Sequence, residues 1–302
     1  MKASVIKNYG GPEVFAYVDV TDPVPAKGEI RVRVAAAGVN PVDIHERSGA
    51  AKSWRPLTFP AILGWDLSGT VDRIGPGVTR FAVGDRVCAW AYHTYAELCV
   101  ARADLFAKVP DGMVLVDAAA LPLVTVTGGQ LVTVATAAEA GQTILVSGAN
   151  GAVGRSAVFA AKARGATVIA GVRREQLSEA ESIGAHRTVA LDDDEAMKSL
   201  PFVDIVANAV RGKTAAMLMS KVKPGGVYAS VTGAPDNAKD YPSVRVVSFV
   251  SKQDSAFLTS MVEAASRGDF LIPIDRRIPL RDAGAGQTAM EKGGIGKVLL
   301  IP

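Results

Sequence analysis

The chain has 302 residues, 49% of them hydrophobic, which suits two domains or one large α/β domain. The formal net charge is only +3 and the Lys and Arg are scattered, so no nucleic-acid-binding footprint is present. Cys88 and Cys99 form no C-x-x-C pair, which favours reduced thiols in a cytoplasmic protein. Residues 1–11 lack a signal-peptide core, and the apolar stretch 118–138 is too interrupted for a membrane span.

Short strands dominate the first part of the chain, up to about residue 120. Each is a β-type run between glycine and proline residues, a pattern typical of strands joined by turns. The predicted strands are Ala3–Lys7, Ile30–Ala36, Leu67–Ile74, Arg86–Trp90 and Ala96–Val100.

From about Asp117 onward, strands and helices alternate, which predicts a parallel sheet covered by helices on both faces. The predicted strands are Thr143–Ser147, Thr167–Val172, Thr188–Leu191, Val203–Ala207, Gly226–Val231 and Val244–Val250. A helix is predicted at Asp254–Arg267. A last strand, Lys297–Ile301, is expected to pack back on the first domain, because alone it could not bury its apolar side chains.

A strand, a glycine-rich turn, a helix and a second strand follow one another between Gln142 and Arg174. This order, in roughly 30 residues, is typical of a βαβ unit whose helix start faces the phosphates of a dinucleotide. The turn reads G-x-x-G-x-x-G, because Asn150 stands at the usual middle glycine, but its context favours dinucleotide binding over an ordinary turn. The predicted contacts are Gly148, Asn150, Gly151, Ala152, Val153 and Gly154.

The end of the second strand indicates which cofactor is bound. Sites selective for NAD usually place an Asp or Glu about 20 residues after the glycines, on the ribose 2′-hydroxyl. Here Arg173 and Arg174 occupy that place, and no acid precedes Glu175. Because arginine pairs with a 2′-phosphate that a carboxylate would repel, the sequence predicts NADPH. The alternative is that both arginines are simply solvated at a strand end.

Polar residues follow two further strands of the predicted sheet. Asn208 follows Val203–Ala207, and Thr232 and Gly233 follow Val227–Val231. Ligands of open α/β sheets bind at the carboxyl ends of the strands, so these residues are predicted to contact the cofactor. Each could instead be only a turn residue or a helix cap.

Further short motifs run through nearly the whole chain. They are AAGVNPVD (36–43), RSG (47–49), FP and GWDLSG within 59–69, GDRV (84–87), AALP (119–122) with Thr127, the glycine turn, SIGA (182–185), KPGG (223–226) and GKV (296–298). In this order they resemble the zinc-independent quinone oxidoreductase branch of the medium-chain dehydrogenase/reductase superfamily.

The resemblance implies an α/β fold in which a Rossmann-type, doubly wound parallel sheet accompanies a GroES-like β-rich catalytic domain. It implies a GroES-like substrate domain at 1–120, a Rossmann NADP(H)-binding domain at 121–255, and a segment at 256–302 that returns to the first domain. It also places Thr127 near the nicotinamide, and it implies a homodimer that shares the edge strand Val244–Val250.

Zinc alcohol dehydrogenases of the superfamily bind their metal through residues that this chain lacks. Asn40 stands in place of the first cysteine, and Trp65 with Asp66 in place of a His-Glu pair. Residues 118–128 offer no further cysteine, and the lobe with four structural cysteines is missing. Neutral Asn and Trp cannot replace a thiolate and an imidazole, so we predict neither catalytic nor structural zinc.

Without zinc, catalysis would depend on holding C4 of the nicotinamide near the acceptor atom. Asn40, Asp43 and His45 are predicted to line the acceptor side and give polar assistance, and Asn40 is also predicted to contact the cofactor. Relatives often carry a Tyr where this chain has His45, and another where it has Ala51, so the proton donor stays open. His93 is a further candidate, and a structural role is the alternative for both histidines.

We therefore expect an NADPH-dependent reductase of quinones or α,β-unsaturated carbonyls, with a small-molecule substrate and no nucleic-acid or membrane partner. A short-chain dehydrogenase is disfavoured because no Tyr is followed four residues later by Lys. The alternative from another class is a non-enzymatic NADPH-binding sensor or crystallin-like protein, since fold does not fix function. The acceptor stays open, because the segments that shape its pocket, 50–58 and 90–95, are the least standard.

Overall fold

The computed structural model describes all 302 residues and divides into two compact units. The first unit consists of Met1–Leu123, Gln253–Gly268 and Ile272–Pro302. The second unit consists of Val124–Lys252 and Asp269–Leu271. The assignment of a substrate domain and a cofactor domain to particular residue ranges stays a prediction.

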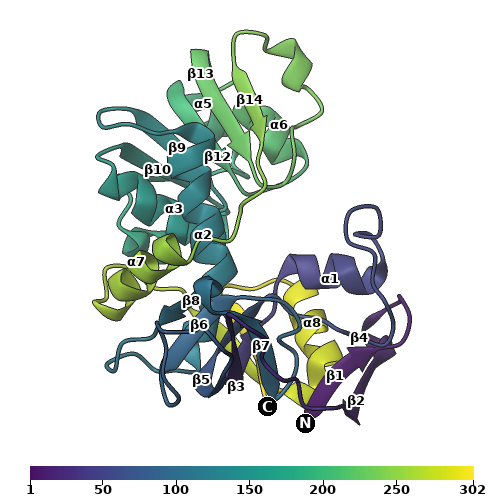
Figure 1. Cartoon of the computed structure of the whole chain (residues 1–302). Coiled ribbons are helices and arrows are strands. Elements are labelled where there is room, and N and C mark those ends of the chain that lie inside the picture. Colours follow the sequence, from purple (N-terminus) through teal and green to yellow (C-terminus); the bar gives the residue numbers. More distant parts are fainter. The chain divides into compact units, whose positions relative to one another are not determined.

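Six parallel strands form the sheet of the second unit, in the order β11-β10-β9-β12-β13-β14 (Figure 1). They are β9 (Thr143–Ser147), β10 (Thr167–Val172), β11 (Arg187–Ala190), β12 (Val203–Asn208), β13 (Val222–Ser230) and β14 (Arg245–Ser248). The strand order reverses at β9, which lies between β10 and β12, and such a reversal is where open α/β sheets bind ligands. The predicted doubly wound parallel sheet is confirmed.

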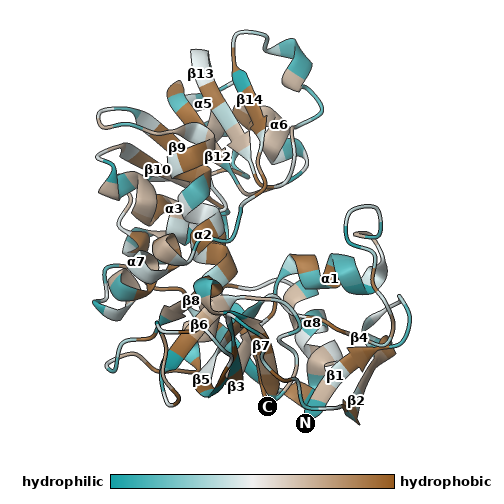
Figure 2. Cartoon of the chain, in the orientation of Figure 1, coloured by the Kyte–Doolittle hydropathy of each residue, from teal (hydrophilic) through white to brown (hydrophobic).

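Helices supply the apolar side chains that cover both faces of this sheet. They are α3 (Ala152–Ala163), α4 (Leu177–Ala180), α5 (Asp194–Ser199) and α6 (Lys213–Met219). Helix α2 (Pro122–Gln130) leads into a helical turn whose Leu131 and Val132 belong to the same core as α3. Successive residues of β9 belong to two different cores: Ile144 packs in the core that contains α3, and Leu145 packs with Met197 and Leu218. Because side chains alternate along a strand, a strand buried on both faces is apolar at successive positions, and brown stretches in β9, β10 and β12 show this in Figure 2.

The sequence-based boundaries were wrong at the start of β13. The strand begins at Val222, whereas the prediction began at Gly226. Pro224 and Gly225 are typical of a turn, but Val222 still pairs with Val203, and the register shifts before the next pair. The irregular register accommodates residues that a regular strand would exclude.

One helical run, Asp117–Thr136, is long and apolar enough by composition to cross a membrane, with a mean hydropathy of 1.5. Within the fold, however, 83% of its apolar window is buried. Leu131 and Val132 are completely buried in the core with α3. Burial in the protein therefore accounts for the apolar character of this run.

The first unit is rich in strands. A three-stranded sheet has the order β2-β1-β4, and a seven-stranded sheet has the order β15-β16-β3-β5-β6-β8, with β7 also paired to β3. The strands are β1 (Lys2–Ile6), β2 (Phe15–Asp19), β3 (Glu29–Gly38), β4 (Ala61–Ile62), β5 (Asp66–Ile74), β6 (Arg86–Trp90), β7 (Leu98–Arg102), β8 (Phe106–Lys108), β15 (Ile274–Pro279) and β16 (Lys297–Ile301). The helices are α1 (Pro41–Ser48), α7 (Ser255–Ser266) and α8 (Ala283–Glu291).

Strand β3 organises this unit because three other strands pair with it. Strand β5 runs antiparallel along most of it, and β7 pairs with its first half. The last strand of the chain, β16, pairs with its final residues, with Leu299 opposite Gly38 and Leu300 opposite Ala37. The end of β3, which leads into α1, is thereby enclosed by strands from the two ends of the sequence.

Candidate functional site

The glycine-rich turn joins β9 to α3 at the carboxyl edge of the sheet. Gly148 has a φ of +64°, a left-handed conformation that glycine adopts without strain. A Cβ at Gly154 would lie 2.1 Å from the carbonyl oxygen of Gly148, so a larger residue would displace the backbone. The middle position accepts Asn150 because its amide donates a hydrogen bond to the Gln176 carbonyl at 3.0 Å, which holds the side chain in place.

The start of α3 presents hydrogen-bonding groups that the protein leaves without side-chain partners. Gly151 is the N-cap and supplies no side-chain hydrogen bond, so the first amides, of Ala152, Val153 and Gly154, have no capping acceptor. The Oδ1 atom of Asn150 is buried and also lacks a partner. A buried unpaired acceptor costs free energy unless a ligand satisfies it. Free amides and an unpaired acceptor fit the phosphates and ribose hydroxyls of a dinucleotide.

Arg155 supports this turn from within the protein, and sequence reasoning missed it. Its side chain is 7% exposed, and its Nε donates to the Asn150 carbonyl at 3.0 Å. Its Nη2 pairs with Glu179 of α4 at 2.6 Å, although burial lowers its pKa. An arginine among the small buried residues of α3 was the available signal, because a buried cation needs such partners.

The two arginines predicted to select the cofactor lie exposed after β10. Arg173 pairs with Glu175 at 3.1 Å, and Arg174 pairs with Asp193. Arg174 also donates its backbone N–H to Asp192 at 2.7 Å. Exposed ion pairs of this kind contribute only about 0–1 kcal/mol, so a phosphate can replace the carboxylates at little cost.

Asn208 lies at the carboxyl end of β12, as predicted, but it is completely buried. Its Oδ1 accepts a hydrogen bond from Ser147 at 2.7 Å, and its Nδ2 donates to the Val210 carbonyl at 2.8 Å and to Ser230 at 3.0 Å. Thr232 donates to the same Val210 carbonyl at 2.8 Å. These bonds join the ends of β9, β12 and β13, and direct contact with a cofactor stays a prediction.

Thr127 lies in α2, with its hydroxyl 2.8 Å from that of Ser251. Gly233 follows Thr232 with a φ of +94°. Both Thr232 and Gly233 line a pocket of about 390 Å³ that also contains Arg211 and Lys213. Sequence reasoning missed these two cations, although they follow the same strand end as Asn208.

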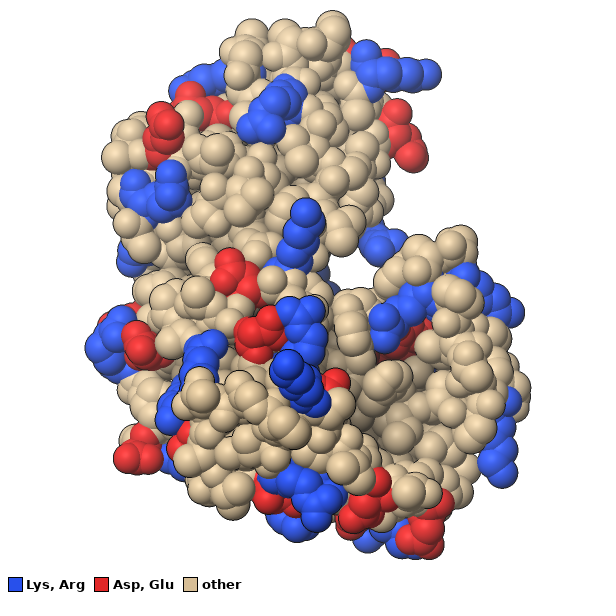
Figure 3. All heavy atoms as spheres, in the orientation of Figure 1, with Lys and Arg blue, Asp and Glu red and all other residues tan.

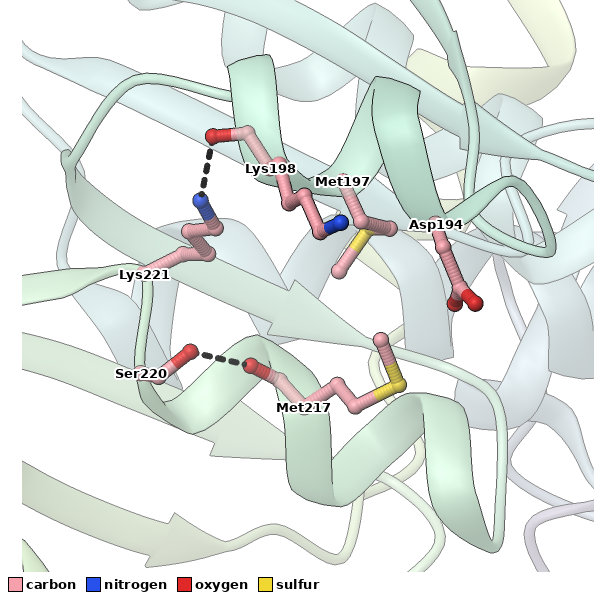
Figure 4. Close-up of a pocket in the computed structure, with 6 residues that line it drawn as sticks. All are labelled: Asp194, Met197, Lys198, Met217, Ser220 and Lys221. Carbon is pink, nitrogen blue, oxygen red and sulfur yellow. Dashed lines mark hydrogen bonds between the residues drawn. The ribbon is translucent and has the colours of Figure 1, made fainter.

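A second pocket of this unit, of about 270 Å³, lies between α5 and α6 and contains none of the predicted residues (Figure 4). Met197 and Met217 face this space from the two helices. The ammonium of Lys221 donates to the carbonyls of Lys198 at 3.2 Å and Leu200 at 3.0 Å. This cation caps the end of α5, and the pocket is also lined by the charged side chains of Asp194 and Lys198.

In the first unit, Asn40 belongs to a completely buried polar cluster. Its Nδ2 donates to Asp66 at 2.8 Å, and its Oδ1 accepts from the ammonium of Lys297 at 2.6 Å. Lys297 also donates to the Val39 carbonyl at 2.9 Å and lies 3.4 Å from Asp66. The backbone N–H of Leu123 donates to the other oxygen of Asp66 at 2.7 Å. We call Asn40, Asp66 and Lys297 the buried ionic cluster.

Asp43 is also completely buried and adjoins this cluster through the backbone of Asn40. Its Oδ2 accepts hydrogen bonds from the N–H of Asn40 and from the hydroxyl of Tyr95, both at 2.8 Å. Its Oδ1 has no partner. Burial raises the pKa of Asp43 to about 8, so this carboxyl is mostly protonated at neutral pH.

The structure therefore brings two of the three predicted acceptor-side residues together. Asn40 and Asp43 meet at the start of α1, whereas His45 lies half-buried on α1 and takes no part in these hydrogen bonds. Sequence reasoning missed Lys297 and Tyr95, and it considered Asp66 only as a failed zinc ligand. A lysine that opens an apolar final strand was the available signal, since buried lysines need partners.

The positions that correspond to zinc ligands in the resemblance have other partners here. Asn40 is bonded within the buried ionic cluster, and Trp65 stacks on Trp90 with ring centroids 6.0 Å apart. Tyr92 meets the Trp65 ring edge-on at 4.9 Å. No group of three or more His, Cys, Asp or Glu side chains is arranged to hold a metal ion. The absence of zinc from the working protein stays a prediction.

Comparison with known proteins gives matches along the whole chain. Residues 26–111 match the family described as the alcohol dehydrogenase GroES-like domain, and residues 152–268 match that described as zinc-binding dehydrogenase. A quinone oxidoreductase from Pseudomonas aeruginosa is 31% identical, over 97% of this chain and 97% of that protein. A 2-haloacrylate reductase from a Burkholderia species is 29% identical, over 99% and 98%.

A solved structure gives the same result. The Escherichia coli quinone oxidoreductase complexed with NADPH superposes with a TM-score of 0.88 at 26% identity, covering 100% of both chains. These matches confirm the expected fold class, a GroES-like unit with a Rossmann-type sheet.

Replacing Lys297 with Met tests the buried ionic cluster. The variant leaves the Asp66 carboxylate buried without its cation, so we expect the free energy of unfolding to fall by about 3–5 kcal/mol. Urea denaturation of the two proteins at pH 7 measures the difference. The matched control is Lys2→Met, whose partner Asp19 is 80% exposed, and a much smaller loss is expected there. Equal losses in both variants would contradict the assignment.

Asp43 should make stability depend on pH. Its folded pKa of about 8 lies above the unfolded value of about 4, so within this window the folded protein holds a proton that the unfolded chain releases. The free energy of unfolding should therefore fall as pH rises, by up to about 1.4 kcal/mol per unit. Asp43→Asn should flatten this dependence between pH 5 and 8 in urea denaturation. An unchanged slope would show that Asp43 is already ionised.

Proposed function

Because the chain belongs to the quinone oxidoreductase branch of the medium-chain dehydrogenase/reductase superfamily, we propose that it is an NADPH-dependent reductase of quinones or α,β-unsaturated carbonyl compounds. The observation that carries the proposal is the uncapped start of α3 beside the unpaired Oδ1 of Asn150. Relatives named quinone oxidoreductase and 2-haloacrylate reductase support the reaction class.

The residues of the second unit would bind and orient the cofactor. The amides of Ala152, Val153 and Gly154 would receive the pyrophosphate, and Arg173 and Arg174 the 2′-phosphate. When bound, NADPH supplies the hydride. Thr127, Asn208, Thr232 and Gly233 would shape the nicotinamide end of the site.

The residues of the first unit would shape the acceptor side without zinc. Asn40 and Asp43 are buried, so their proposed part is to fix the start of α1 and thereby the position of His45. Reduction of a quinone or an enone consumes a proton as well as a hydride. His45 is half-buried and is the proposed side-chain source of that proton, with water as the other source.

The proposal includes a cytoplasmic homodimer. Strand β14 is the edge of the six-stranded sheet, and Val250 just beyond it is 84% exposed. An exposed apolar edge favours pairing with a second copy of the chain.

The reductase reading is tested by following NADPH oxidation spectrophotometrically on metal-stripped protein, with ortho-quinones, para-quinones and enones as acceptors. We expect turnover that survives chelation. Loss of activity on chelation would contradict the zinc-free proposal. Tight NADPH binding without turnover of any acceptor would favour the non-enzymatic alternative.

The arginine pair is tested by the double substitution of Arg173 and Arg174 with Ala. Each lost charge-assisted bond costs about 1.5–3 kcal/mol, so the Kd for NADPH should rise by at least about 10-fold, while that for NADH stays unchanged. The control is Arg187→Ala, an exposed arginine at the opposite, amino end of the sheet. Equal weakening of both cofactors would mean that the arginines do not contact the 2′-phosphate.

A further inference from the structure

A pocket of about 420 Å³ in the first unit contains, of the candidate residues named above, only His93. Its lining comes from residues 55–58 and 60–62 and from His93. Residues 55–58 and His93 belong to the two least standard segments of the sequence, 50–58 and 90–95, which meet here. The walls are mostly apolar, with Leu57 and Ile62 among them, and the charged or titratable lining residues are Arg55 and His93.

The guanidinium of Arg55 is held by three contacts. It lies 3.9 Å from the centroid of the Tyr92 ring and 5.0 Å from that of Trp65. Its Nε forms an ion pair with Glu46, whose side chain is 2% exposed. The ion pair of Arg55 involves Nε alone, no hydrogen bond from its two terminal amino groups to the protein is present, and the side chain as a whole is 26% exposed. The guanidinium of Arg55 is therefore held through Nε, and the edge formed by its two terminal amino groups is free to bind a ligand.

His93 is placed by a strained backbone. Its φ of +63° is uncommon for a residue other than glycine and costs free energy that the surrounding structure must offset. Its Nδ1 lies 2.9 Å from the carbonyl oxygen of Ile62, and a carbonyl only accepts, so Nδ1 carries the proton. The remaining nitrogen, Nε2, is therefore the one left for a ligand in this pocket.

We propose that this pocket binds the carboxylate of the acceptor, and that the preferred acceptor is a small α,β-unsaturated acid. A carboxylate matches the free edge of the Arg55 fork in a bidentate, charge-assisted pair. Stacking on Tyr92 and pairing with Glu46 fix the guanidinium in advance, so little side-chain entropy is lost when the acid binds. The apolar walls fit the short carbon chain.

The position of the pocket connects it with the proposed reaction, on which this inference rests. Arg55 lies on the ring of Trp65, and Trp65 stands where the superfamily's zinc enzymes have a metal-binding histidine. In the reaction, the C=C π bond breaks, the β-carbon gains the hydride of NADPH, and the α-carbon gains a proton from water. The carboxylate keeps its charge throughout, so one guanidinium can hold substrate and product alike.

The test compares 2-butenoate with its methyl ester, which differ by the charge that Arg55 would recognise. In the wild-type protein with NADPH, we expect kcat/KM to be higher for the acid. Arg55→Gln should lower kcat/KM for the acid by about 10–100-fold, mainly through KM, and leave the ester unchanged. Arg55→Lys keeps the charge and the pairing with Glu46 but loses the fork, so an intermediate loss is expected.

Controls separate a binding role from a structural one. Arg80→Gln removes an exposed arginine that also lies on an aromatic ring, that of Phe81, and it should change neither acceptor. If Arg55→Gln lowers kcat/KM equally for acid and ester, Arg55 only supports the pocket and the inference is overturned.

The inference and the proposed function fail in different ways. Reduction of para-quinones and the ester without reduction of the acid would overturn the inference and leave the proposed function standing. If no acceptor is reduced, calorimetric titration with butyrate, an unreactive acid, shows whether the pocket binds a carboxylate. Butyrate binding that is weakened in Arg55→Gln supports a carboxylate site, and absent or unchanged binding overturns it.

Discussion

The first unit depends on one ammonium group that is buried at the start of the last strand. Removing Lys297 and Asp66 from water costs several kcal/mol for each ion, and only a complete set of partners offsets that cost. Here the partners are the Asn40 side chain, the Val39 carbonyl and the Leu123 amide. Because all must be in place together, the end of β3, the start of β5 and the start of β16 have fixed positions. The position of helix α1 is fixed as well, because α1 begins directly after β3.

In the second unit, polar side chains with a full set of hydrogen bonds hold the strands together, whereas polar groups without partners are available to a ligand. Asn208 makes a full set of hydrogen bonds at the carboxyl edge of the sheet, and these bonds hold three strand ends. Asn150 lies in the turn that follows β9, the strand next to β12. Its side-chain NH2 group donates a hydrogen bond, whereas its side-chain oxygen has no partner. The first pattern belongs to a scaffold, and the second leaves a place for a ligand group. Burial alone would not distinguish the two asparagines.

The sequence was sufficient for the six strands of the second unit's sheet and for the glycine turn, because both depend on neighbouring residues. In the first unit it missed the strands β2, β4 and β8. The runs Thr143–Ser147 and Lys297–Ile301 have the predicted bounds, since apolar β-branched residues and flanking turns are local signals. The start of β13 was missed because a register shift through Pro224 is decided by the neighbouring strand. Local signals likewise placed Asn208 at a strand end without showing that it is fully bonded.

The polar cluster of the first unit could not be predicted, because its members are far apart in sequence. Asn40 and Lys297 are 257 residues apart and meet only when β16 pairs with β3. The same holds for Arg55 and Tyr92, which come from two loops with no shared pattern. Sequence motifs gave the residue types at the site, whereas their partners follow from topology.

The pairing of β16 with β3 has a consequence for the way the protein is made. Translation releases the chain from its amino end, and domains fold as their residues emerge. Most of the second unit is a continuous stretch, so it is complete while the ribosome is still adding residues. The first unit is not, because the strand that closes the end of β3 and carries the cation for Asp66 is synthesised after most of the second unit. The amino-terminal part of the first unit therefore keeps an open strand edge and a hydrated carboxylate until β16 has been synthesised.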